Sequence, residues 1–159
     1  MYTVGILERT GALSAFLAAH LPQSLLDRAD LCPAGSLAPG EILDLLVVSP
    51  DWTGENRSVS PCRAMLIPGR LAHLAEGLTA SWAVSFGLSP KDSLTLSSMG
   101  EETICLALQR EVITLTGQRL DPQEFPLDRK GHTALCQVLA CAGVQLLLGV
   151  EPGEVGLSP

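Results

Sequence analysis

The sequence has little charge and few aromatic side chains. Only 17% of its 159 residues are Asp, Glu, Lys or Arg, and only 4% are Phe, Trp or Tyr. Its 10 basic residues are outnumbered by 17 acidic ones, which gives a formal net charge of -7 at pH 7. Because nucleic-acid binding needs clustered Lys and Arg, and the sequence has no such cluster, we expect no DNA or RNA partner.

Long apolar runs and a basic leader are also missing. The longest mostly apolar run, Val144 to Val150, is far shorter than the roughly 20 residues that span a bilayer. The segment 1–21 has no basic residues before its apolar ones and is interrupted by Glu8 and Arg9. We therefore expect no membrane segment and a cytoplasmic protein.

Paired metal-ligand and redox motifs are absent too. Five cysteines, an odd number, form no CxxC pair and are expected to be reduced, mostly as small buried hydrophobes: Cys32, Cys62, Cys105, Cys136 and Cys141. No HxH or HExxH spacing brings two strong ligands onto one face. We expect no bound metal and no cofactor.

What the sequence does have is apolar residues, which make up 47% of the chain. A chain of this length buries about two thirds of its extended surface, so we expect one α/β domain over residues 1–159. The low charge also suggests that some apolar surface is covered by a protein partner, for which a homodimer is the simplest form.

Residues 1–86 alternate strands with helices or loops. The sequence predicts a strand at Tyr2 to Leu7, then a helix capped by Thr10 or Ser14 and ended by Pro22. Further expected elements are a brief strand within Ser24 to Leu31, buried strands at Ile42 to Val48 and Arg63 to Ile67, a short helix at Leu71 to Leu78, and a strand at Trp82 to Phe86. Such crossovers give a parallel sheet.

After Gly87 the pattern becomes β-rich and then helical. Short strands with close turns in residues 87–128 predict a hairpin or meander, and Pro122 and Pro126 place its last strand at an edge. Residues 131–149 contain a closing helix, from Thr133 to Leu148. The expected fold is therefore a Rossmann-like open, mainly parallel sheet with flanking helices and a β-hairpin or meander before the last helix.

The order of elements over residues 81–155 resembles the end of the central, ATP-binding domain of Mur ligases. The shared features are the strand ending VSFGLS at Val84 to Ser89, the β segment Leu94 to Leu127, and the helix from Gly131 through Leu148-Gly149. This resemblance covers less than half of the chain. It implies a related scaffold for the protein.

The phosphate-binding loop of that family is not matched. Its place after the first strand is taken by GILERTG, Gly5 to Gly11, which has no lysine and one glycine in the turn, while Glu8 would bring negative charge toward a triphosphate. The resemblance therefore implies the scaffold without the ligase reaction, and we transfer none of the family's functional residues.

Other catalytic patterns are equally incomplete. Gly5 and Gly11 do not form GxGxxG, although Asp27 or Asp30 has the spacing of a ribose-binding acid. The GLS at Gly87 is not a GxSxG elbow. We expect His132 near the start of the last helix, and His20 and His73 to be ordinary surface or half-buried residues. The two glutamates at 101–102 are expected in a hairpin turn, where their charge keeps the loop in water.

Loops that follow parallel strands gather at the carboxyl edge of a sheet, where ligands bind in open α/β folds. We expect a modest pocket of positive character there, lined by Arg9, Trp52, Asn56, Arg57, Ser89 and Lys91. The simpler interpretation is that these six are solvated loop residues without a binding role.

Two functions fit these observations. The favoured one is a non-catalytic module that binds a small ligand or a protein partner and is related to Mur ligase central domains. The alternative is a small enzyme, a transferase or hydrolase, that acts on a nucleotide or cell-wall precursor at the strand-end loops.

Overall fold

The computed structural model describes residues 1–55 and 58–159. The first half of the chain contains β1 (Tyr2–Leu7), α1 (Ala12–His20), α2 (Gln23–Leu26), β2 (Ala29–Pro33), β3 (Leu43–Val48), β4 (Cys62–Pro68), the 3₁₀ helix η1 (Gly69–Gly77) and β5 (Ala80–Phe86). The second half contains β6 (Leu94–Met99), β7 (Thr103–Leu108), β8 (Val112–Ile113), β9 (Arg119–Leu120), β10 (Gln123–Asp128), α3 (Leu135–Leu147) and the 3₁₀ helix η2 (Pro152–Glu154).

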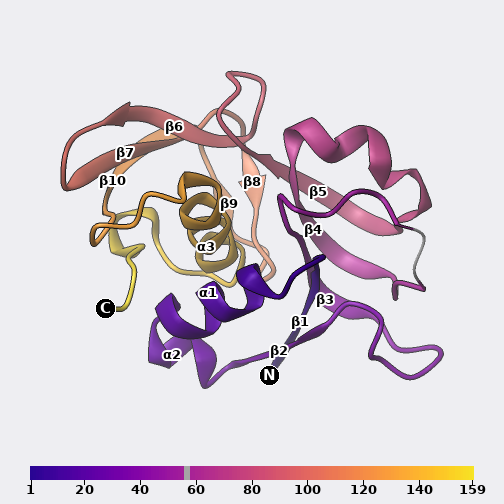
Figure 1. Ribbon diagram of the computed structural model, residues 1–159. Helices are drawn as coiled ribbons and strands as arrows, with labels where there is room; N and C mark the ends of the chain where they lie inside the picture. The colour runs from indigo at the N-terminus through magenta and orange to yellow at the C-terminus, as the bar shows by residue number, and fades with distance from the viewer. Residues whose placement is uncertain (56–57) are drawn as a thin grey trace.

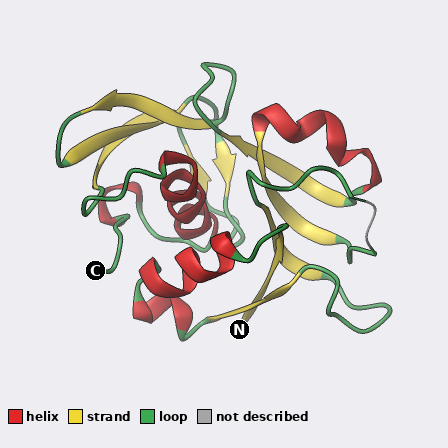
Figure 2. Ribbon diagram, in the orientation of Figure 1, coloured by secondary structure: helices red, strands yellow, loops and turns green. Residues whose placement is uncertain are grey.

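An eight-stranded sheet organises the described residues, in the order β10-β7-β6-β5-β4-β3-β1-β2 (Figures 1 and 2). The strands from β2 through β6 in this order are parallel. Strand β7 pairs antiparallel with β6, and β10 pairs antiparallel with β7. The predicted α/β fold with an open, mainly parallel sheet is confirmed. The predicted β insertion is present as β6, β7 and β10, with β8 and β9 as a separate two-stranded sheet.

Each face of the sheet has its own apolar layer. On one face, α1, α2 and α3 cover the side chains of alternate strand residues, including Val4, Leu45 and Leu66 (Figure 1). On the other face, η1 and the loop after β3 cover Leu46, Met65 and their neighbours. Helix α3 is buried from Val138 to Leu147, which explains why its sequence is apolar on all sides rather than on one stripe.

Two local expectations are refined by the structure. The brief strand expected within Ser24 to Leu31 begins only at Ala29 and runs to Pro33, because α2 takes the first part of this segment. Strand β2 lies at the edge of the sheet, where the Asp30 side chain is exposed to solvent. The segment near Leu71 forms a 3₁₀ helix that starts at Gly69.

The prediction that proline places the last strand at an edge is confirmed. Strand β10 pairs only with β7 and carries Pro126 opposite Cys105. A proline has no N–H to donate, so an edge position leaves no ladder hydrogen bond unmade.

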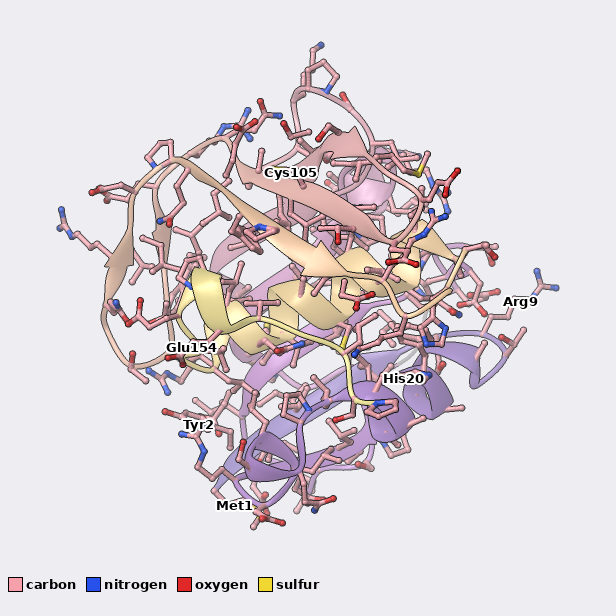
Figure 3. The ribbon with its side chains drawn as sticks, turned by 90° about the vertical axis from the view of Figure 1, so that its left-hand side faces the viewer. Met1, Tyr2, Arg9, His20, Cys105 and Glu154 are labelled. Atoms are coloured by element: carbon pink, nitrogen blue, oxygen red, sulfur yellow. The ribbon has the colours of Figure 1, made fainter. Side chains whose placement is uncertain are left out.

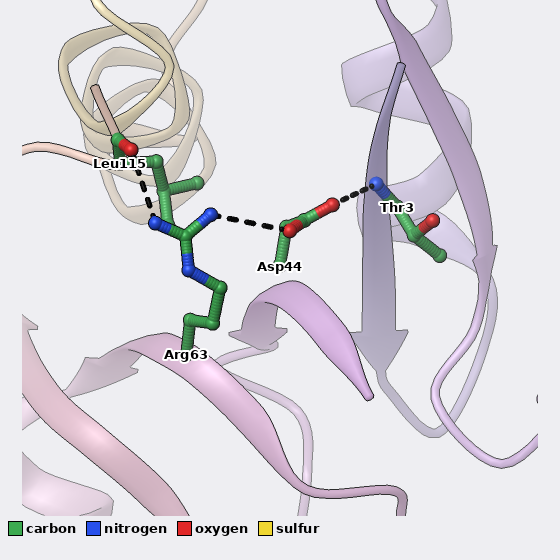
Figure 4. Close-up of polar contacts among 4 residues, drawn as sticks. All are labelled: Thr3, Asp44, Arg63 and Leu115. Carbon is green, nitrogen blue, oxygen red and sulfur yellow. Dashed lines mark hydrogen bonds and ion pairs between the residues drawn. The ribbon is translucent and has the colours of Figure 1, made fainter. Parts of the chain in front are cut away.

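A polar bridge ties the amino ends of three central strands together (Figure 4). Asp44 Oδ2 accepts the backbone N–H of Thr3 at 2.8 Å, and Asp44 Oδ1 accepts a hydrogen bond from Arg63 Nη1 at 3.3 Å. Arg63 Nη2 also donates to the Leu115 carbonyl at 3.2 Å, which holds the segment after β8 against the sheet. Because Arg63 and Asp44 are 40% and 26% exposed, this ion pair adds little stability and mainly fixes position.

The segment after α3 returns over the helices and is held at two points. Gln145 Nε2 donates to the Gly156 carbonyl at 2.7 Å, and Gln145 Oε1 accepts the Gly156 N–H at 3.1 Å. The Ser158 N–H donates to the His20 carbonyl at 2.8 Å, and His20 Nδ1 lies 2.8 Å from the Ser158 carbonyl oxygen. These contacts bury Val155 and Leu157 against the helical layer.

We predict that Gln145→Leu lowers the free energy of unfolding by about 2–3 kcal/mol, because both polar groups of the half-buried Gly156 then lose their partner. Urea unfolding followed by circular dichroism measures this loss. Gln123→Leu, on the exposed edge strand, is the control and should change stability by less than about 0.5 kcal/mol. Equal effects of the two substitutions would contradict the role given to Gln145.

Candidate functional site

The carboxyl ends of β1 to β5 and the first turns of α1 and α3 meet at one edge of the sheet. Three hollows lie along this edge. The first, about 770 Å³, lies beyond β1 and β2, and the second, about 650 Å³, lies beyond β4 and β5. The third, about 400 Å³, lies between Ser49 to Asp51 and the start of α3. This is the edge at which open α/β sheets bind ligands.

The turn between β1 and α1 is occupied by the chain's own carboxylates. Asp51 Oδ1 accepts the N–H of Arg9 at 3.1 Å, and Asp51 Oδ2 accepts the Thr10 N–H at 3.1 Å and the Thr10 hydroxyl at 2.7 Å. Glu8 Oε1 accepts the N–H groups of Leu13 and Ser14 at 3.0 and 3.2 Å. The amides that hold phosphate in nucleotide-binding folds are therefore paired internally.

The expected capping of α1 is partly present. Gly11 is the N-cap residue, in a left-handed conformation, and Thr10 Oγ1 accepts the N–H of Ala12, the first helical residue, at 3.4 Å. Ser14 supplies no capping oxygen: Glu8 accepts the N–H groups of Leu13 and Ser14, and the Ser14 hydroxyl donates to the second Glu8 oxygen. The negative charge of Glu8 also lies at the positive end of the helix dipole, so the group that would repel a triphosphate stabilises α1.

The hydrogen bonds to Asp51 also change its acidity. Burial acts to raise the pKa of Asp51, but the hydrogen bonds from the Thr10 hydroxyl, the Arg9 amide, Ser49 and the Thr10 amide together outweigh it. The pKa of Asp51 is therefore below its ordinary value, and the charged form is the one that the turn favours.

The cavity beyond β4 and β5, called the β4–β5 cavity here, has mostly apolar walls and a few convergent polar groups. It is lined by Pro68, Gly69, Arg70, Ala72, Ser85, Phe86, Gly87, Leu88, Ser89, Lys91, Asp92 and Cys136. Cys136, in the first turn of α3, also lines the third hollow. The volume of the β4–β5 cavity lies in the range of small-molecule sites, roughly 300–1,000 Å³.

Asp92 is the most constrained polar group of this cavity. It is 4% exposed, and its Oδ2 accepts the Ser89 N–H at 3.1 Å. A Cβ atom at Gly69 would lie 1.8 Å from Asp92 Oδ1, and one at Gly87 would lie 2.5 Å from Oδ2. The carboxylate thus fits between two strand ends only because both positions are glycine.

The turn that carries Asp92 is fixed from a neighbouring strand. Gln109, just after β7, donates through Nε2 to the carbonyls of Pro90 and Asp92 at 2.7 and 3.2 Å. Ser85 Oγ accepts the Ser93 N–H at 3.0 Å, and Ser89 Oγ accepts the Lys91 N–H at 3.2 Å. Both serine hydroxyls therefore have a structural task in the turn.

The structure distributes the six predicted site residues differently from the expected single pocket. Ser89 and Lys91 line the β4–β5 cavity. The Arg9 side chain points away from the body of the molecule (Figure 3) and lines none of the three hollows. Trp52 is only 5% exposed and packs with Leu46 and Leu71 in the core, so burial removes it from the surface. Asn56 and Arg57 lie outside the described residues.

Arg70, Asp92 and Cys136 are site residues that the sequence reasoning did not select. Asp92 lies in the stretch SPKD, where an Asp at the fourth position of a turn can accept the N–H of the first residue. Gly69 and Gly87, each directly after a strand, were a second signal at the same place. Arg70 and Cys136 had no local signal, because only the fold brings them to this edge.

The remaining cysteines and histidines form no second chemical centre. All five cysteines are free, and burial raises the pKa of Cys62 to about 11 and that of Cys141 to about 12, as inert thiols require. The rings of His20 and His132 pack against each other with centroids 4.2 Å apart, next to Phe16. Within residues 1–55 and 58–159, no group of three or more potential metal ligands converges, and no helix is long and apolar enough to cross a membrane.

We predict that Glu8→Ala lowers the free energy of unfolding by about 1 kcal/mol, because two N–H groups of the first turn of α1 lose their acceptor. Thermal and urea unfolding measure the effect. Glu76→Ala, on the exposed surface of η1, is the matched control and should be close to neutral. The cap assignment fails if the two variants unfold alike.

The lowered pKa of Asp51 predicts a pH-dependent contribution to stability. A group with a depressed pKa in the folded state stabilises above its ordinary pKa, here 3.8, and loses this contribution as the pH falls through the folded value. Asp51→Ala should therefore cost about 1 kcal/mol at pH 6 and less at pH 3. Urea unfolding of both proteins at the two pH values tests this, and a cost that grows toward pH 3 would contradict it.

Comparison of the sequence with models of known protein families and with curated proteins gives no match. The geometry of the carboxyl edge is therefore the basis for the functional argument.

Proposed function

We propose that this chain is a non-catalytic module that binds a small ligand in the β4–β5 cavity. The observation that carries the proposal is the contrast along the carboxyl edge. The amides after β1 are paired with Glu8 and Asp51, whereas the β4–β5 cavity is open, mostly apolar and ringed by polar groups. A ligand can enter this cavity without displacing a capping group of α1.

The relationship to Mur ligase central domains is part of the same proposal. It is supported by the order of elements after Trp82: a parallel strand, an antiparallel excursion through β6, β7 and β10, and then the closing helix α3. The internal pairing of the β1–α1 turn explains how such a scaffold persists without holding a phosphate chain. In this proposal the ligand binds in the β4–β5 cavity, at the same sheet edge, instead of at the turn between β1 and α1.

Binding without catalysis is preferred over the enzyme alternative because of what the polar groups of the cavity already do. The hydroxyl oxygens of Ser85 and Ser89 accept backbone N–H groups in the turn that carries Asp92. The three histidines, all in the described part of the chain, do not line the β4–β5 cavity. Nucleophilic catalysis needs a hydroxyl or thiol activated by a base, and among the described residues no hydrogen bond joins the hydroxyl of Ser85 or Ser89 to a basic side chain.

A fragment screen by two-dimensional ¹⁵N NMR tests the proposal. Fragments that bind should shift the amides of residues 69–72 and 87–92. Ala72→Trp, which adds bulk at an exposed position of the cavity wall, should reduce this binding at least tenfold, while Ala19→Trp on the exposed surface of α1 should leave it unchanged.

Binding at the first hollow instead, or equal loss of binding in the two tryptophan variants, would contradict the assignment of the cavity. If no fragment shifts any amide, a small-molecule site is ruled out and a protein partner, including a second copy of the chain, becomes the preferred function.

A further inference from the structure

We propose that the natural ligand of the β4–β5 cavity is a zwitterion with an apolar body, such as an apolar amino acid, whose ammonium group binds Asp92 and whose anionic group binds Arg70 and Lys91. This inference rests on the proposed function and specifies the ligand of the same cavity.

The ammonium group is inferred from the state of Asp92. A carboxylate has about four acceptor positions, and a buried one is costly unless these are used. In the described residues, Asp92 receives one hydrogen bond from a protein donor, the Ser89 N–H on Oδ2. Oδ1 lies against Gly69 with no donor, and no Lys, Arg or His forms an ion pair with Asp92 in the described part of the chain.

Asp92 is also held in place before any ligand arrives. The two glycines leave a slot that fits the carboxylate, and Gln109 fixes the carbonyls on both sides of Lys91. A charged acceptor that is buried, fixed and open on one oxygen is complementary to a cationic donor. A protonated amine satisfies it with both charge and N–H groups.

The anionic group is inferred from two cations on opposite loops of the cavity. Arg70 follows β4 and Lys91 lies in the turn after β5. Arg70 Nη2 donates to the carbonyl of Pro50, which lines the neighbouring third hollow, and the guanidinium keeps further N–H donors. Among the described residues, neither cation is paired with a carboxylate. The cavity lining thus holds two cations and one carboxylate, a local excess of positive charge in a chain whose net charge is -7.

The apolar body is inferred from the remaining walls. Pro68 and Phe86 line the cavity, and Leu88 lines it while remaining 59% exposed. An apolar ligand group in this space would remove the Leu88 side chain from water and add favourable burial. The three features together select a small molecule with a cation, an anion and an apolar group, rather than a nucleotide.

A set of matched probes tests this inference by titration into the ¹⁵N-labelled protein. L-phenylalanine carries both charges, phenethylamine only the ammonium, 3-phenylpropionate only the carboxylate, and 2-phenylethanol neither. We expect L-phenylalanine to bind most tightly, phenethylamine about tenfold more weakly, and 2-phenylethanol weakest, with shifts at residues 87–92. This comparison requires no variant, so it holds even where a substitution impairs folding.

Asp92→Asn separates ligand binding from a purely structural role. Asparagine still offers an oxygen to the Ser89 N–H but loses the charge, so the fold should persist while L-phenylalanine and phenethylamine bind at least tenfold more weakly and 3-phenylpropionate is unaffected. Lys91→Met should weaken the binding of only the two probes that carry a carboxylate, L-phenylalanine and 3-phenylpropionate. Asp121→Asn and Lys130→Met, both at exposed positions, are the matched controls.

The outcomes distinguish this inference from the proposed function. If 2-phenylethanol or 3-phenylpropionate binds in the cavity as tightly as L-phenylalanine, or Asp92→Asn leaves all affinities unchanged, the zwitterion is wrong while the cavity remains a binding site. If none of the four probes shifts the cavity amides, the inference is overturned. The fragment screen then decides separately whether the cavity binds any small molecule.

Discussion

The fold depends on how the chain satisfies the backbone amides where β1 turns into α1. A helix start leaves several N–H groups without partners, and a parallel sheet gathers such starts at one edge. In nucleotide-binding folds a phosphate fills this position. Here Glu8, from the turn itself, and Asp51, from the loop after β3, supply the oxygen atoms. The sheet keeps its architecture, and its anion-binding position is used for stability.

The stretch after β5 has a similar double role. Leu94 begins β6 beside Phe86, so SFGLSPKDSLTLSS forms part of the sheet frame. The turn within it buries Asp92 between Gly69 and Gly87 and presents Lys91 to the same cavity. The same residues therefore form part of the sheet frame and part of the cavity wall. A substitution at either glycine would displace the carboxylate and change both.

The fold was largely predictable because its signals are local. Strand β3 was predictable from a run of apolar residues broken only by Asp44, and Pro126 marks an edge, so element types and the parallel sheet follow from the sequence. The site was only partly predictable. Ser89 and Lys91 lie directly after a strand, where loops meet at the sheet edge. The prediction that Trp52 lines a pocket was wrong, because an aromatic residue in a polar loop gives no sign that its side chain packs into the core. Arg70, at the start of η1, and Cys136, in the first turn of α3, meet at the cavity because the sheet brings the starts of these two helices, on opposite faces, to the same edge. No local sequence pattern encodes that placement.

The most direct test of this account is a titration of the ¹⁵N-labelled protein with ATP and magnesium, followed at the amides of residues 9–14. The account predicts no saturable shift of these amides at millimolar concentrations, because four of them, those of Arg9, Thr10, Leu13 and Ser14, already donate to Asp51 or Glu8. Saturable shifts confined to these residues would show that a polyphosphate displaces the two carboxylates, and would contradict it.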